Sequence, residues 1–502
     1  MNDFTNSIIR LIVCLLVLSC SAVTVCAERP LAPLADAVED KDWTRFSALL
    51  AEKADPNQAQ VDGTTALHWA VYHDNVAAVK QLLEMKANPL ATNRYDVAPL
   101  SLASGNGNAE MIQLLLAAGA DVNTSLSFGE TALMTASRTG RVDAVKLLLK
   151  HGASVKATEL NKGQSAIMWA AAEGHVQVVD ELIRAGADFR RPLKSGFTPF
   201  FFAVRGGHTK VVQRLLEAGI DVNDTLTTDM TGGKRPRNDM SPLILALENG
   251  HFELGVKLLE AGADPNDQRS GYTPLHAITW TRKPNRGDGP DGDPPPAGSG
   301  DVTSLQFVRH LVKHGANVNT RLKRGSSGRA RLNQTGATPF LMAAKTADVP
   351  LLKLLLELGA DASITNVDNC TPLMAAAGIG TIAPTEEAGT EEEALETIAL
   401  LLKLGADVDA VDKNGETAMH GAAYKSLPKV AWLLHEKGAD LRVWNKKNKY
   451  GWTPLLIAEG HRQGNFKPSF ETIDALHGIM RSNGITPPPP TPREQRKGYD
   501  QD

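Results

Sequence analysis

Residues 271–278 read GYTPLHAI: a glycine, a Thr-Pro step and the start of an apolar helix. A Thr suits the N-cap of a helix, and a Pro suits its first turn, where the missing N–H costs nothing. The same stretch returns as GTTALHWA (63–70), CTPLMAAA (370–377) and GETAMHGAA (415–423). A returning motif indicates a chain built from repeats. The 502 residues therefore need not form the three or four independent domains that length alone would suggest.

The threonine of this step, or its counterpart, recurs at a regular interval. The first five counterparts lie 33, 33, 34 and 33 residues apart, and four of the six later intervals lengthen, to 43, 65, 46 and 36. A 33-residue period with the TPLHxA step is the ankyrin signature, and the chain resembles ankyrin-repeat proteins over residues 33–480. The resemblance implies an all-α solenoid of helix-turn-helix units joined by short β-hairpin loops. The eleven positions are Thr65, Ala98, Thr131, Ser165, Thr198, Ser241, Thr273, Thr338, Thr371, Thr417 and Thr453.

Each unit also carries a signal for the end of its second helix. A glycine at this point can adopt the left-handed conformation that stops a helix. Nine units have it, at Gly119, Gly152, Gly186, Gly219, Gly262, Gly315, Gly359, Gly405 and Gly438. The first two units depart from the pattern, with Lys53 and Lys86 in its place. We expect strain, or a different closure, at these two turns.

The N-terminus predicts export. Arg10 precedes the apolar run LIVCLLVLSCSAVTV (11–25), and VCA ends at Ala27. A charged start, an apolar centre and a small-x-small end describe a secretory signal peptide, with cleavage between Ala27 and Glu28. A lipoprotein signal with Cys20 as the lipidated residue is the alternative. Export leads to a periplasmic or secreted protein, or to a lipid-anchored one, with no membrane span in the mature chain. Cys370 would be its single cysteine.

The organisation follows from these signals. Residues 1–27 form the signal peptide, residues 28–60 a capping helix pair, residues 61–480 eleven repeats, and residues 481–502 a Pro-rich disordered tail. Turns and hairpins of repeats tolerate insertions. We expect insertions near residues 225–239, 281–303, 322–336, 379–392 and 460–469.

The longest insertion, which follows GYTPLHAI, could have been a metal site. Asp288, Asp291 and Asp293 lack the alternating ligands and the closing Glu of a calcium loop. His310 and His314 have zinc-compatible spacing, but no third ligand is apparent, and a His before the Gly stop can serve the helix C-terminus. The expectation is a solvated loop, no metal and no cofactor.

No catalytic motif stands out. The sequence has no GxSxG, HExxH, Walker loop or paired-Cys motif. In the ankyrin resemblance, His68, His276 and His420 of the TPLH step hydrogen-bond between adjacent repeats. His175, His208 and His251, which open second helices, are also expected to be structural. An enzyme is therefore the least favoured of the three functions considered.

The resemblance instead implies binding through a concave face built from hairpin tips and the ends of first helices. Exposed aromatic and Arg side chains are typical anchors of protein interfaces. The alternative is that several of them pack against neighbouring hairpins. Trp69 and Trp169 are not among the candidates, because we expect them to fill the apolar core. We expect Tyr272, Trp280 and Arg282 to lie close together. The candidates are Tyr72, His73, Tyr95, Phe128, Arg138, Phe197, Arg205, Tyr272, Trp280, Arg282, Tyr424 and Trp452.

Charge adds little to this picture. The net charge is −4, with basic stretches at 232–238, 281–286 and 322–332 and an acidic one at 385–396. The balance excludes no partner class by itself, but nucleic acid does not suit an exported protein. The sequence thus predicts a monomeric, non-catalytic, exported scaffold that binds a protein partner. The second hypothesis is an effector or inhibitor that occludes a secreted or host enzyme.

Overall fold

The computed structural model describes residues 32–228, 239–285, 294–325, 331–464 and 467–491. The chain divides into two compact units. Unit 1 comprises residues 1–136 and 143–154, and unit 2 comprises residues 137–142 and 155–502. The signal peptide, its cleavage site at Ala27 and Glu28, and Cys20 lie outside the described residues. So do the three Asp residues of the longest insertion.

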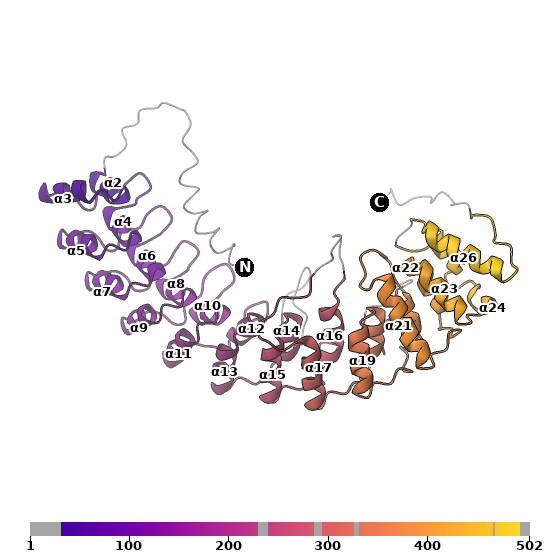
Figure 1. Cartoon of the computed structure of the whole chain (residues 1–502). Coiled ribbons are helices and arrows are strands. Elements are labelled where there is room, and N and C mark those ends of the chain that lie inside the picture. The colour runs from indigo at the N-terminus through magenta and orange to yellow at the C-terminus, as the bar shows by residue number, and fades with distance from the viewer. Residues whose placement is uncertain (1–31, 229–238, 286–293, 326–330, 465–466, 492–502) are drawn as a thin grey trace, which may run out of the picture. The chain divides into compact units, whose positions relative to one another are not determined.

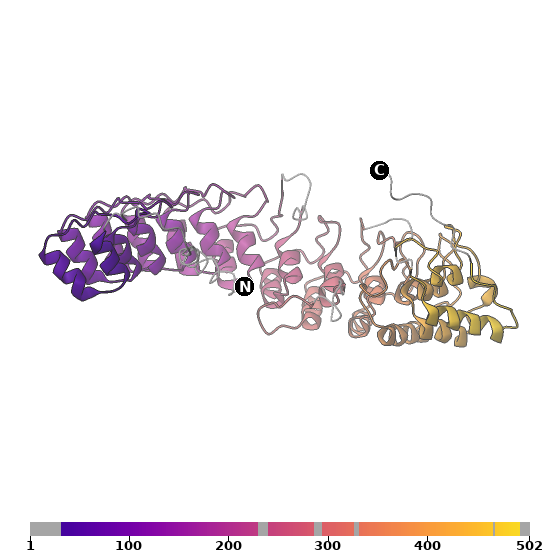
Figure 2. The same ribbon diagram turned by 90° about the horizontal axis from the view of Figure 1, so that it is seen from above.

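In unit 1 the helices come in pairs, with first helices in one row and second helices in another (Figure 1). Figure 2 shows the connecting loops of this unit lying together along one edge of the rows. The helices are α2 (Pro33–Glu39), α3 (Trp43–Ala51), α4 (Ala66–Tyr72), α5 (Val76–Glu84), α6 (Pro99–Asn106), α7 (Ala109–Ala117), α8 (Ala132–Arg138) and α9 (Val142–Lys150). The last two residues of α8 and the first of α9 belong to unit 2.

Unit 2 continues the same pairing. Its first helices are α10 (Ala166–Ala172), α12 (Pro199–Arg205), α14 (Pro242–Glu248), α16 (Pro274–Arg282), α18 (Pro339–Lys345), α20 (Pro372–Ala377), α22 (Ala418–Lys425) and α25 (Pro454–Ala458). Its second helices are α11 (Val176–Arg184), α13 (Thr209–Glu217), α15 (Phe252–Glu260), α17 (Ser304–Lys313), α19 (Val349–Glu357), α21 (Glu391–Lys403), α23 (Pro428–Glu436) and α26 (Phe470–Ser482). One short helix, α24 (Leu441–Trp444), lies between α23 and α25. Figure 1 shows α10 to α16 and α11 to α17 as two neighbouring rows.

The TPLH step starts the first helices in the way the sequence predicts. The Thr198 side chain accepts a hydrogen bond from the backbone N–H of Phe201, and Pro199 occupies the first turn. At α4 and α16 the Thr and the His three residues later form a reciprocal capping box. The fold is an all-α ankyrin solenoid. Its hairpin loops contain isolated β-bridges in the described residues, such as Ser125 with Thr131 and Thr158 with Ser165.

The histidines of the step join adjacent repeats. In His276 the Nδ1 atom lies 2.8 Å from the Thr273 hydroxyl, and the Nε2 atom lies 3.0 Å from the Ala337 carbonyl oxygen of the next repeat. His68 and His420 make the same pair of contacts, with the carbonyls of Val97 and Lys446. Burial lowers the pKa of His276 and of His420 to about 4. These residues are structural, as the sequence predicts.

The two lysines at the early helix stops adopt the conformation that glycine adopts elsewhere. The φ angle is 58° at Lys53 and 68° at Lys86, against 97° at Gly119. A side chain with a Cβ atom is strained in this left-handed region. The expected strain is therefore present, and the turns close in the usual way.

Candidate functional site

The first-helix face is the row of side chains that stand four and seven residues after each N-cap. Trp69 and Trp169 occupy the earlier of these positions, and Arg138, Arg205 and Trp280 the later one. Both tryptophans are half-buried, so the expectation that they fill the core is wrong. The reason is their position on the helix: in α4 the neighbouring Leu67, Ala70 and Val71 take the buried side, and Trp69 stands on the more exposed one.

In unit 1 this face carries a cluster of rings. The Tyr72 side chain is 46% exposed and meets the Trp69 ring edge-on, with 5.6 Å between centroids. The His73 ring stacks on Trp69 at 5.9 Å, and its Nε2 atom lies 3.2 Å from the Glu39 carbonyl oxygen. Burial lowers the pKa of His73. The structure therefore brings Tyr72 and His73 together, around a tryptophan that the sequence had placed elsewhere.

Two further candidates of unit 1 lie at hairpin tips. Tyr95 is 47% exposed and Phe128 is 38% exposed. The guanidinium of Arg94 stacks 4.8 Å above the Tyr95 ring and donates a hydrogen bond to its hydroxyl. These two aromatics are surface residues, as the hairpin position indicates.

In unit 2 the same face pairs arginines with aromatic rings. The guanidinium of Arg138 lies 5.1 Å from the ring centroid of Trp169. That of Arg205 lies 4.8 Å from Phe197 and 5.2 Å from Phe202. Phe197 is only 8% exposed, so its expected exposure at a hairpin tip is wrong. Its ring packs against that of Phe202, with 5.2 Å between centroids. This contact with the apolar surface of helix α12 removes the ring from water.

Tyr272 and Trp280 meet at a carboxylate that the sequence did not point to. Their rings pack edge-on with 5.0 Å between centroids. The Glu248 Oε1 atom accepts a hydrogen bond from the Tyr272 hydroxyl at 3.0 Å and from the Trp280 Nε1–H at 3.3 Å. Tyr272 is 7% exposed and Trp280 is half-buried. Tyr272 is thus not a surface residue. The sequence does contain a signal for this cluster. Glu248 stands seven residues after the N-cap Ser241, and the next repeat contains Tyr272 and Trp280.

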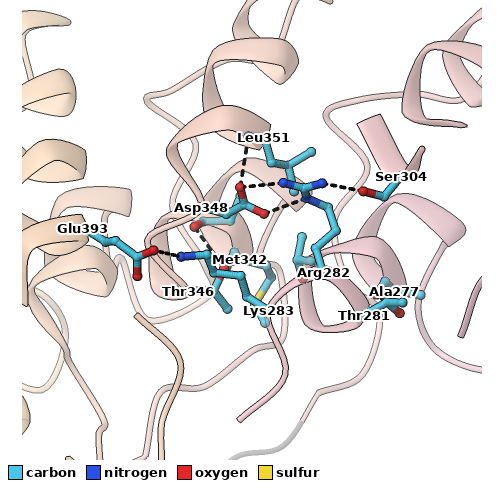
Figure 3. Close-up of polar contacts among 12 residues, drawn as sticks. Ala277, Thr281, Arg282, Lys283, Ser304, Met342, Thr346, Asp348, Leu351 and Glu393 are labelled. Carbon is cyan, nitrogen blue, oxygen red and sulfur yellow. Dashed lines mark hydrogen bonds and ion pairs between the residues drawn. The ribbon is translucent and has the colours of Figure 1, made fainter. Parts of the chain in front are cut away.

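Arg282 does not join Tyr272 and Trp280. Its Nε atom donates to the Asp348 Oδ2 atom at 2.7 Å, and its Nη1 atom donates to the Ser304 hydroxyl (Figure 3). Asp348 also accepts from the backbone N–H of Leu351 and so caps helix α19. The neighbouring Lys283 pairs with Glu393 (Figure 3). The expected position of Arg282 on the surface is wrong, because a buried carboxylate in the next repeat binds it.

Tyr424 is fully buried, contrary to the expectation of an exposed helix end. Its hydroxyl donates to the Glu416 Oε1 atom at 2.8 Å, and the Asn448 Nδ2 atom donates to the same oxygen at 2.8 Å. Burial and the nearby charge of Asp412 raise the pKa of Glu416 to about 7. The Arg462 guanidinium, brought in by the insertion near residues 460–469, donates to the Tyr424 carbonyl oxygen and covers this helix end. The insertion explains the burial.

Trp452 is half-buried at the last hairpin tip. Its ring lies 5.3 Å from that of Tyr450, and its backbone N–H donates to the Asn448 Oδ1 atom. It therefore partly packs on its own hairpin.

A cavity with a volume of about 310 Å³ lies where insertions approach helix α18. Lys345 and Glu387 line it and pair with each other at 3.2 Å. In the described residues, no group of three His, Cys, Asp or Glu side chains is arranged to hold a metal ion. His314, one of the two histidines with zinc-compatible spacing, uses Nδ1 to contact the His310 carbonyl at its helix end.

Comparison with known proteins agrees with the geometry. The family model for ankyrin repeats matches residues 34–125, 92–159, 157–226 and 388–466, together more than half of the chain. The chain is 30% identical to the mouse B-cell lymphoma 3 protein homolog over 162 residues, 32% of this chain and 31% of that protein. It is 32% identical to the chicken nuclear factor NF-kappa-B p105 subunit over 165 residues, 28% of this chain and 16% of that one. It is 30% identical to the zebrafish neurogenic locus notch homolog protein 1 over 175 residues, 31% of this chain and 7% of that one.

The chain therefore spans about a third or less of the length of these relatives. No helix among the described residues is both long and apolar enough to cross a membrane. The repeat period, the capped first helices, the inter-repeat histidines and the family match agree: the chain belongs to the ankyrin-repeat family.

Proposed function

We propose that the protein is a non-catalytic, exported scaffold that binds a protein partner through the first-helix face and the inserted loops. Ankyrin repeats are protein-interaction modules whose stacked units create extended binding surfaces. The observation that carries the proposal is the row of half-buried or exposed Trp169, Arg205 and Trp280 on this face. Trp and Arg are the residues most enriched at interface hot spots.

Export is the second part of this proposal. It rests on the charged, apolar and small-residue segments of residues 1–27. A partner would then meet the protein in the periplasm or outside the cell. The whole-chain roles of the longer relatives do not transfer, because the shared part is only the repeats.

The test uses the full chain as bait in an extract of the producing cells, with bound proteins quantified by mass spectrometry. Trp169→Ala and Trp280→Ala should each reduce capture of one specific protein severalfold. The matched control is Trp432→Ala, because Trp432 is a half-exposed Trp on second helix α23 of the same unit. Equal capture by wild type and both face variants would contradict the proposal.

A further inference from the structure

Arg205 ends helix α12 and stacks on two phenyl rings, those of Phe197 and Phe202. Each ring is 8% exposed, whereas Arg205 itself is exposed. Within the described parts of the chain, its guanidinium has no hydrogen bond and no ion pair. The other arginine that ends a first helix of this unit beside an insertion, Arg282, has a buried carboxylate instead. Arg205 therefore keeps its donors available to a partner.

The aromatic surroundings make this guanidinium a strong anion binder. A guanidinium has five N–H donors in a rigid fork that matches a carboxylate. Burial against the rings lowers the pKa of Arg205 below its ordinary value, but an Arg stays protonated at neutral pH. A charge with less water around it gains more from a bound anion, since the local dielectric constant is lower.

A second arginine lies on the same face at a matching position. Arg138 and Arg205 each stand seven residues after an N-cap Thr, two repeats apart, and Arg138 stacks on Trp169 of the repeat between them. Packed helices lie ~8–10 Å apart, so the two positions are roughly 20 Å apart. An extended chain covers this span with about six residues. The exposed Glu173 is the one acid at the end of the intervening helix.

We propose that this face of unit 2 binds an extended acidic segment of the partner protein. One carboxylate of the segment pairs with Arg205, and an apolar side chain of the same segment contacts the Trp169 ring. The inference rests on the proposed function and adds the chemistry of the partner. Charge complementarity at Arg205 carries it: this exposed guanidinium lies on two phenyl rings and pairs with no acid in the described residues, and Arg138 adds a second, half-buried cation on the same face.

The test is a selection of random 12-residue peptides, displayed on phage, against the full wild-type chain. Selected peptides should be enriched in Asp and Glu, with an acid about three residues from an apolar residue. A synthetic peptide of the selected sequence should bind Arg205→Met about tenfold or more weakly. The matched control is Arg184→Met, because Arg184 lies on second helix α11 and already pairs with Glu181. Circular dichroism and thermal melting show that each variant is folded, and Arg205→Lys should restore part of the binding.

Three outcomes would overturn the inference. Selection of basic or purely apolar peptides would do so, as would equal binding to Arg205→Met and wild type. The third is Arg205-dependent binding of a 20-nucleotide single-stranded oligonucleotide that is at least as tight as binding of the peptide. If the selected peptides lack acids but lose binding in Trp280→Ala, the partner chemistry is wrong and the protein-binding function stands. If no peptide depends on any residue of the face, both fail.

Discussion

The carboxylate of Asp348 lies fully buried against the guanidinium of Arg282, a residue 66 positions earlier at the start of the longest insertion. The two Arg282–Asp348 contacts measure 2.7 and 3.1 Å, and the Arg282 side chain is 16% exposed. The pair ties the end of first helix α16 to the start of second helix α19. An insertion that looked like a detached loop thus begins inside the fold.

Removing one partner of this pair should destabilise unit 2 strongly. Arg282→Met leaves Asp348 buried without its cation, which costs about 3–5 kcal/mol. Urea unfolding followed by circular dichroism measures the change. Arg309→Met is the control, because its pair with Glu357 is solvent-exposed, and it should have little effect. Equal stability of the two variants would show that the Asp348 site tolerates an unpaired charge.

The centre of the longest insertion should be dispensable for stability, whereas the segments that lead into it and out of it should not be. In the segment that leads out of the insertion, Ser299 contacts the His251 ring through its backbone N–H and its hydroxyl. The backbone N–H of Asp301 donates a hydrogen bond to Glu253. Deleting residues 286–293 with a Gly-Ser bridge should shift the melting temperature by a few degrees at most, because loop closure changes by only ~0.6 kcal/mol per doubling. Deleting 284–300 should lower it further. A calcium- or zinc-dependent stabilisation lost on the short deletion would show that the loop is a metal site.

Stability should fall as pH rises through the titration of Glu416. Its pKa in the folded protein is about 7, above the ordinary 4.5, so folding favours the protonated form. Stability from this group is present at low pH and is lost between about pH 4.5 and 7, by at most on the order of 3 kcal/mol. Urea midpoints at pH 5 and pH 8 measure it. Glu416→Gln should flatten this difference, and an unchanged difference would show that another group titrates.

His276 should give stability the opposite dependence on pH. Its folded pKa is about 4, below the ordinary 6.5, so folding favours the neutral ring. Stability is lost as pH falls from about 6.5 towards 4. At neutral pH, His276→Ala should lower stability by roughly 1–3 kcal/mol, because the Ala337 carbonyl loses its donor. An undiminished urea midpoint would contradict the inter-repeat role.

Export predicts a processed N-terminus near Glu28. Sequencing of the native protein from its producing cells measures this directly. A lipid on Cys20 would support the alternative anchor, whereas an intact Met1 in the cytoplasm would contradict export.

The repeats were predictable from the sequence because each is built from local signals. Three signals act within one unit: a Thr that caps the first helix, a His three residues later, and a Gly in the left-handed conformation that ends the second helix. The structure contains all three. Side-chain exposure was less predictable. From the sequence we expect Phe197, Tyr272 and Tyr424 to be exposed, but each of them packs on another side chain. Phe197 packs on Phe202, Tyr272 binds Glu248, and Tyr424 is covered by Arg462. The contacts of Tyr272 and Tyr424 depend on a neighbouring repeat or on inserted residues, which no single unit encodes, whereas Phe197 packs within its own unit.

The insertion contacts have a consequence for how unit 2 unfolds. In a plain solenoid each repeat touches only its neighbours, so ends can fray one repeat at a time. Here Lys283 reaches Glu393 across the intervening repeat of α18 and α19, and Arg462 reaches the Thr381 carbonyl across the repeat of α22 and α23. Each link binds a repeat to the one beyond its neighbour. The repeats from α16 to α26 should therefore open as one cooperative block, with amide hydrogens that exchange together.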